Sequence, residues 1–73
     1  MTPQREAFFR CTFSSPRRTS VAHVAAWDER EAIQLFSAEL VEEGVGERGT
    51  IEVEPLEGEG GRSTRRALYR PAN

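Results

Sequence analysis

The sequence is short of the residues on which many protein functions depend. It has one cysteine, Cys11, which excludes an internal disulfide and any metal site with several cysteine ligands. It has one histidine, His23, so a closed zinc site of the usual kind cannot form. No apolar run approaches the roughly 20 residues that span a bilayer, and the opening stretch MTPQREAFFR has no signal-peptide core. We expect a cytoplasmic protein without a metal or other cofactor.

Lysine is also absent, so all ten basic residues are arginines, and the charges are unevenly distributed. Residues 28–59 contain eleven of the twelve acids and two of the ten bases, a net charge of −9, although the whole chain carries −2. With 73 residues, 37% hydrophobic and 30% charged, the composition is typical of one small soluble domain. We expect that domain to span residues 1–73, with residues 1–6 and 71–73 frayed.

The stretch 26–46 predicts one helix, from about Glu29 to Glu43, with signals at both ends. Asp28 is suited to cap the first turn, and Glu31 stands where a capping-box acid reaches back to the Asp28 N–H. Gly44 stands where a left-handed residue closes a helix. Between these ends, apolar residues recur on one stripe, which predicts that a single face is buried: Ile33, Phe36 and Leu40.

Alternating apolar residues predict strands at 7–14, 19–26, 50–54 and 63–70, joined in two hairpins. The predicted fold class is α+β: one helix packed on a four-stranded antiparallel sheet, in the order β-β-α-β-β. We place the third strand beside the first, because pairing it with the second would require a parallel crossover. The expected core, with Trp27 at the start of the helix, comprises Phe9, Phe13, Val21, Ile33, Phe36, Leu40, Ile51, Val53 and Tyr69.

The first hairpin raises the question of catalysis. If its turn is symmetric about Arg17, Cys11 faces His23, and such a pair can serve as nucleophile and base. No third orienting residue or oxyanion loop accompanies the pair, however. We interpret Cys11 as a core residue beside a half-exposed imidazole, and we expect no enzymatic activity and no catalytic residues.

In the second hairpin, one register keeps the apolar side chains on a common face. It pairs Ile51 with Tyr69 and places Glu54 opposite Arg66, so that opposite charges meet on the outer face. A slip by one residue would turn Arg66 inward, which disfavours that alternative.

Acidic residues gather where local stability does not require them. Glu39, Glu42 and Glu43 are neighbours on the predicted helix, near the negative end of its dipole. One interpretation is a solvated face that keeps the protein soluble. The functional interpretation is an acidic face that covers a basic, nucleic-acid-binding site on a partner protein. Its contact residues would be Glu39, Glu42, Glu43 and Glu47, with Glu52 and Glu54 secondary, and such a protein would be a monomer.

Two alternatives remain open. The arginines could form a patch that binds phosphate, as in a small nucleic-acid-binding module or repressor, through Arg17, Arg18, Arg62 and Arg65. Against this, the patch lacks aromatic residues for base stacking, and the chain is acidic overall. The other alternative is a structural module whose exposed edge strand pairs with itself or with another chain.

The stretches AWDEREAIQLFSAEL and RGTIEVEPLE follow a short hairpin and precede another. This layout resembles small phage-encoded anti-CRISPR proteins that act on type I systems. The resemblance covers residues 7–70 and implies a non-enzymatic inhibitor of a CRISPR effector complex in the host cytoplasm, in some cases a DNA mimic. Anti-CRISPR proteins share no common signature, so no residue roles follow. The arginines after Gly60 depart from an all-acidic mimic and favour a single acidic face.

Overall fold

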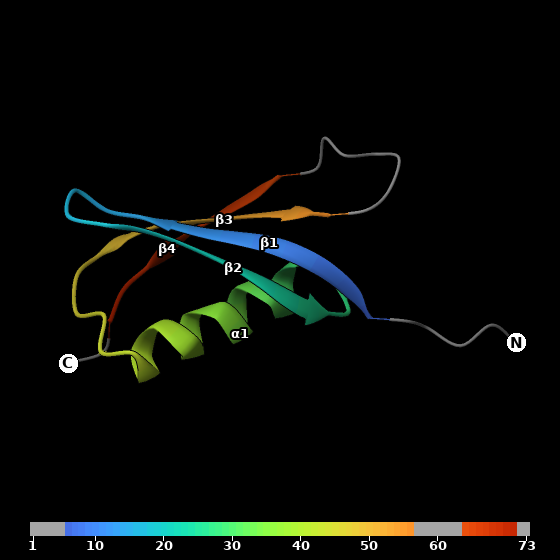
Figure 1. Cartoon of the computed structure of the whole chain (residues 1–73), viewed down its shortest axis with the longest axis horizontal. Helices are drawn as coiled ribbons and strands as arrows, with labels where there is room; N and C mark the ends of the chain where they lie inside the picture. Colours follow the sequence, from blue (N-terminus) through green and yellow to red (C-terminus); the bar gives the residue numbers. More distant parts are fainter. Residues whose placement is uncertain (1–5, 57–63, 72–73) are drawn as a thin grey trace, which may run out of the picture.

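The structure, a computed structural model, describes residues 6–56 and 64–71. It confirms the α+β class and the predicted order of elements. One helix packs against one face of a four-stranded antiparallel sheet, as Figure 1 shows. The elements are β1 (Ala7–Ser14), β2 (Thr19–Ala26), α1 (Glu29–Glu42), β3 (Gly49–Pro55) and β4 (Arg65–Tyr69).

The strand order in the sheet is β2-β1-β3-β4, so β3 lies beside β1, as expected. Every neighbouring pair is antiparallel, and β2 and β4 are the two edges. In the described residues, α1 is the one element that covers a face, and it contacts all four strands. The opposite face of the sheet, called here the outer face, carries exposed side chains such as Phe8, Val21 and Leu68.

Both ends of α1 form as the sequence predicts. The Asp28 carboxylate accepts a 2.8 Å hydrogen bond from the Glu31 N–H, while the Glu31 carboxylate accepts one of 2.7 Å from the Trp27 N–H. The bond from Glu31 thus reaches one residue further back than expected. At the other end, Gly44 adopts φ +84° and the Val45 N–H donates to Leu40, which closes the helix in a Schellman motif.

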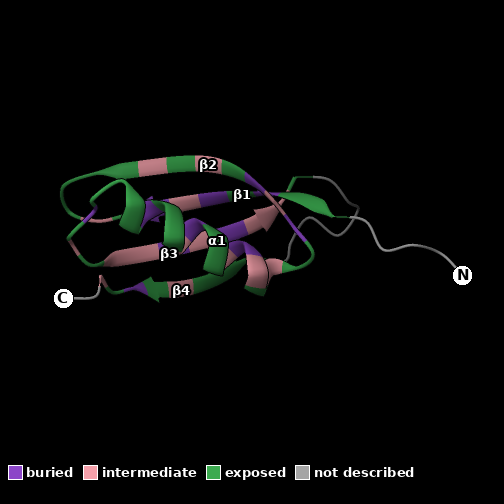
Figure 2. Ribbon diagram, turned by 90° about the horizontal axis from the view of Figure 1, so that it is seen from below, coloured by how far each residue is buried: buried purple, intermediate pink, exposed green. Residues whose placement is uncertain are grey.

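The core lies between α1 and the sheet (Figure 2). Seven of the expected core residues are buried, Ile33 is partly buried, and Val21 and Trp27 are about half exposed. The prediction was therefore wrong for Val21. The buried apolar residues are Phe9, Cys11, Phe13, Val24, Ala26, Ala32, Phe36, Leu40, Val45, Ile51, Val53 and Tyr69.

The position of Val21 follows from the register of the first hairpin, which differs by one residue from the expected one. Cys11 lies opposite Ala22, and His23 lies opposite Arg10. The Ser15 N–H donates to the Arg18 carbonyl at 2.9 Å, so the turn is symmetric between two residues rather than about Arg17. Because strand side chains alternate, this one-residue difference turns Val21 and His23 to the outer face.

The second hairpin is shifted by two residues, which leaves each side chain on the expected face. Tyr69 lies opposite Gly49 rather than Ile51, and Arg66 lies opposite Glu52 rather than Glu54. Gly49 explains the position, since a Cβ there would lie 2.4 Å from the Phe13 ring. The Tyr69 ring instead packs edge-on against that ring, with centroids 5.4 Å apart.

Candidate functional site

The last turn of α1 and its C-cap carry three exposed acids, Glu39, Glu42 and Glu43. The last turn has no basic residue, and among the described residues no ion pair involves any of the three. Leu35 lies four residues before Glu39 and seven before Glu42, on the same stripe, and its side chain is 43% exposed. We call Leu35, Glu39, Glu42 and Glu43 the acidic helix surface.

The acidic helix surface works against the stability of α1. Like charges three or four residues apart raise the energy of a helix by about 0.2–0.5 kcal/mol for each pair. Acids at the carbonyl end also oppose the helix dipole, typically by about 0.3–1 kcal/mol each. At the other end, Asp28 and Glu31 lie where negative charge is favourable and form the cap. The chain thus carries acids at both ends of α1, although only the acids at the N-terminal end stabilise the helix.

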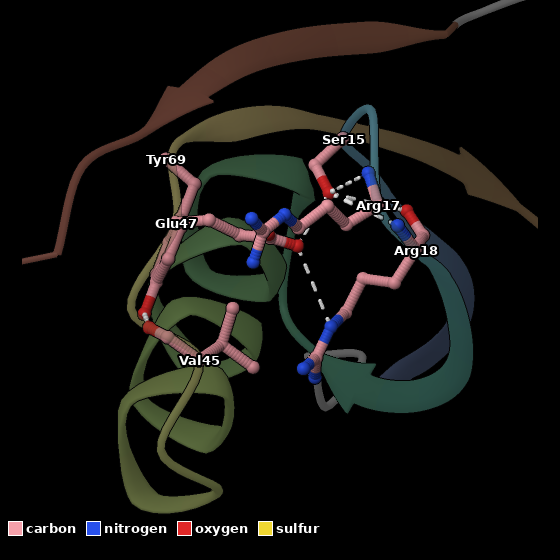
Figure 3. A network of polar contacts seen from close by, with 6 residues as sticks. All are labelled: Ser15, Arg17, Arg18, Val45, Glu47 and Tyr69. Carbon is pink, nitrogen blue, oxygen red and sulfur yellow. Dashed lines mark hydrogen bonds and ion pairs between the residues drawn. The ribbon is translucent and has the colours of Figure 1, made fainter.

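The acidic helix surface is attached to a well-anchored part of the fold. Val45, just beyond α1, is buried, and its carbonyl accepts a 2.9 Å hydrogen bond from the Tyr69 hydroxyl (Figure 3). The Schellman closure holds the same turn from the helix side. The backbone that presents Glu42 and Glu43 is therefore fixed before any partner arrives, which lowers the entropy lost on binding.

Glu47 has a different environment from the helix acids. Its carboxylate accepts a 2.6 Å hydrogen bond from the Ser15 hydroxyl and lies 3.5 Å from Nε of Arg18 (Figure 3). The same hydroxyl accepts bonds from the backbone N–H groups of Arg17 and Arg18, which shapes the β1–β2 turn. Glu47 thus joins two loops, and this role leaves less of its charge for a partner.

Glu52 and Glu54 lie on the outer face, away from α1, since they alternate with the buried residues of β3. Glu52 pairs with Arg66 at 2.8 Å, and Glu54 pairs with Arg10 at 2.9 Å. The six acids expected to contact a partner therefore do not form one face. Three remain together on α1, one joins loops, and two are neutralised on the opposite side of the sheet.

The three described arginines of the predicted patch, Arg17, Arg18 and Arg65, do not lie together. Arg17 and Arg18 lie in the β1–β2 turn, whereas Arg65 begins β4, opposite Val53. Figure 1 shows the turn and the start of β4 toward opposite ends of the sheet. Arg62, the fourth predicted member, lies outside the described residues.

Cys11 is a core residue, as expected, and the structure does not bring it opposite His23. It lies between Ala22 and Val53 on the neighbouring strands and is fully buried. Burial, and to a lesser degree the negative charge of Glu39, together raise the pKa of the Cys11 thiol from 9.0 to about 11. A thiol held protonated in this way is a poor nucleophile. Within residues 6–56 and 64–71, no three His, Cys, Asp or Glu side chains gather as metal ligands.

The sequence pattern predicted the three helix acids as contact residues but not Leu35. The signal was available, because Leu35 lies off the buried stripe of Phe36 and Leu40 and on the stripe of Glu39 and Glu42.

No helix of the described chain has the length and apolar character to cross a bilayer. No known protein family, curated protein or solved structure matches this chain.

Proposed function

We propose that this chain is a non-enzymatic binding protein that covers a basic surface of a partner protein with the acidic helix surface. The observation that carries the proposal is the grouping of Glu39, Glu42 and Glu43 on an anchored helix end. Among the described residues these acids have no ion pair, and they reduce the stability of the helix that bears them. Positive charges of a basic partner would offset the repulsion among these acids and their unfavourable interaction with the helix dipole.

The chemistry of the surface fits a protein partner. Leu35 supplies exposed apolar area beside the acids, and protein interfaces combine an apolar centre with a charged rim. Complementary charge accelerates association and selects the partner. A nucleic-acid-binding groove on another protein is the kind of basic surface that such acids would cover.

The most concrete form of this function is inhibition of a type I CRISPR effector complex. Support for this form comes from the layout described above, in which a hairpin, a single helix and a second hairpin follow one another within a short chain. The acids on α1 would then compete with target DNA for arginine and lysine side chains of the effector.

The experiment is target-DNA binding by purified type I effector complexes, with this protein titrated in. We expect loss of DNA binding at near-stoichiometric protein. A Glu42→Gln/Glu43→Gln variant should weaken inhibition about tenfold or more, because it removes two charges from the acidic helix surface. The matched control is Glu52→Gln/Glu54→Gln, which removes two charges from the outer face and should inhibit like the unaltered protein.

Two results would count against the proposal at different levels. If DNA binding is unaffected and the protein co-elutes with none of the effectors, the proposed inhibition of a type I CRISPR effector complex is wrong. If inhibition occurs but both double variants inhibit equally well, the partner binds elsewhere and the acidic helix surface is not the contact.

A further inference from the structure

The two edges of the sheet differ in how they are protected against pairing with another strand. β4 has five residues, of which Arg65 and Arg66 are charged. β2 has eight residues with no proline, lysine, arginine, aspartate or glutamate, and it pairs with β1 along its whole length without a bulge. Natural edge strands usually carry one of these protective features. β2 carries none.

The hydrogen bonds identify which backbone groups of β2 face the free edge. In an antiparallel pair, every second residue exchanges bonds with its partner. The bond from Ser15 to Arg18 starts that alternation in the β1–β2 hairpin, and the bond from Leu56 to Phe8 gives the same alternation from the β3 side. Residues 20, 22, 24 and 26 therefore bond to β1, and residues 19, 21, 23 and 25 point their N–H and C=O groups outward.

This alternation restricts how a second strand can join. Two copies of β2 can exchange hydrogen bonds only between residues 19, 21, 23 and 25 of each copy. All four share the outer face, so pairing keeps the faces of both copies aligned. The two helices would then lie on the same face of one continuous sheet.

We propose that β2 pairs antiparallel with β2 of a second copy, about a two-fold axis at Ala22. Val21 of each copy then faces His23 of the other, and Thr19 faces Ala25. This arrangement forms about eight hydrogen bonds between the chains. The two Ala22 residues meet at a closely spaced position, where small side chains fit. The two neighbouring registers, centred on Val21 and on His23, each form about six bonds, and the second places the two imidazoles opposite each other.

The second copy is favoured over an unrelated strand for a physical reason. A symmetric dimer brings the same set of residues against itself, so an edge whose charges all have one sign meets like charge. On β4 that set includes Arg65 and Arg66, which would repel their counterparts. On β2 it contains no lysine, arginine, aspartate or glutamate, and it includes Val21, which is 57% exposed. The proposed dimer differs from the monomer expected from the sequence, and it does not depend on the acidic helix surface.

The test is sedimentation equilibrium of the full chain with two designed variants. We expect a mass of about 16 kDa, twice the 8.2 kDa of one chain, that falls on dilution. Val21→Lys/His23→Lys places lysine opposite lysine at both contacts and should give a monomer. Val21→Lys/His23→Glu places opposite charges together and should remain a dimer. In the register centred on His23, the second variant would oppose two glutamates.

A second measurement covers the case in which a variant does not fold. Amide exchange of the unaltered protein should show slow exchange for the N–H groups of Val21, His23 and Ala25 at high concentration. On dilution these amides should exchange at least tenfold faster, while the Ala22 amide, bonded to β1, stays protected. A monomer at millimolar concentration, equal masses for the two variants, or fast exchange of these edge amides at every concentration would overturn the proposal.

Discussion

The hydroxyl of Tyr69 donates a 2.9 Å hydrogen bond to the backbone carbonyl of Val45. Tyr69 ends β4, the last strand, and Val45 lies in the loop that follows α1, so one bond joins the final strand to the end of the helix. Both residues are buried. The bond thus holds the backbone beside Glu42 and Glu43, and it connects the packing of the sheet to the proposed binding surface.

Replacing Tyr69 by Phe should lower the free energy of unfolding by about 1–3 kcal/mol. The ring would still pack against Phe13, but the buried Val45 carbonyl would lose its partner. Urea denaturation measures the change. Arg66→Gln, which breaks an exposed ion pair with Glu52, is the control and should cost less than about 1 kcal/mol. Equal effects of the two changes would show that the buried hydrogen bond contributes no more than a surface pair.

Gly49→Ala should destabilise the fold by about 1–3 kcal/mol. The added Cβ would lie 2.4 Å from Cε1 of Phe13 and 2.5 Å from the Ser14 carbonyl oxygen, and backbone cannot easily withdraw. Gly46→Ala, in the loop that precedes β3, is the control, because apart from its chain neighbours no atom lies within 4 Å of a Cβ placed there. Thermal unfolding should separate the two variants by several degrees. Identical melting temperatures would contradict the close packing of Gly49 on β1.

Glu42→Gln/Glu43→Gln should raise the free energy of unfolding by about 0.5–1.5 kcal/mol at low salt. The change removes charges that oppose the helix dipole and that repel Glu39. The gain should shrink at 0.5 M salt, because screening weakens exposed charges. Urea denaturation at two salt concentrations tests this. The same variant is expected to lose partner binding, so stability and function should change in opposite directions. A variant less stable than the unaltered protein would disprove the electrostatic account.

Cys11 should make stability fall at alkaline pH. Its thiol has a pKa raised to about 11 in the folded protein, against about 9 in the unfolded chain. The folded state therefore holds its proton more tightly. The resulting stability is fully present below about pH 9 and is lost, by roughly 2–3 kcal/mol, as pH rises through 11.

Urea denaturation at pH 8 and pH 10.5 measures the loss, and Cys11→Ala provides the reference for all other titrating groups. As pH rises, the free energy of unfolding of the unaltered protein should fall relative to that of Cys11→Ala. The thiol should also react slowly with Ellman's reagent at pH 8, and rapid labelling of the folded protein would contradict its burial.

Local patterns in the sequence were sufficient for the elements of the fold. Asp28 and Gly44 mark the two ends of α1, because capping and the left-handed turn depend on residues within a few positions of each other. Alternation identified the inward residues of β1 and β3. The antiparallel order β2-β1-β3-β4 followed from the strand directions, because pairing β3 with β2 would require a parallel crossover.

Pairing across strands was not decided by local patterns. The turn at Ser15 shifts the pairing of β2 by one residue from the predicted register. Val21 is therefore exposed, and His23 does not lie opposite Cys11. Close packing at Gly49 shifts the pairing of β4 by two residues from the predicted register. Arg66 therefore pairs with Glu52, and Glu54 pairs with Arg10 instead. Alternation along β3 places Glu52 and Glu54 on the outer face in either register, so the register decided only which β4 arginine pairs with which acid.

The sequence by itself determined which segments form strands and helix, and which acids lie at the helix end, because these depend on spacing along the chain. Only the tertiary structure decided which charges are neutralised and which stay free. That outcome depends on register, and register is set by single contacts between residues far apart in sequence, such as Tyr69 with Val45. A shift by one or two residues hardly changes local propensity, yet it reassigns every cross-strand partner.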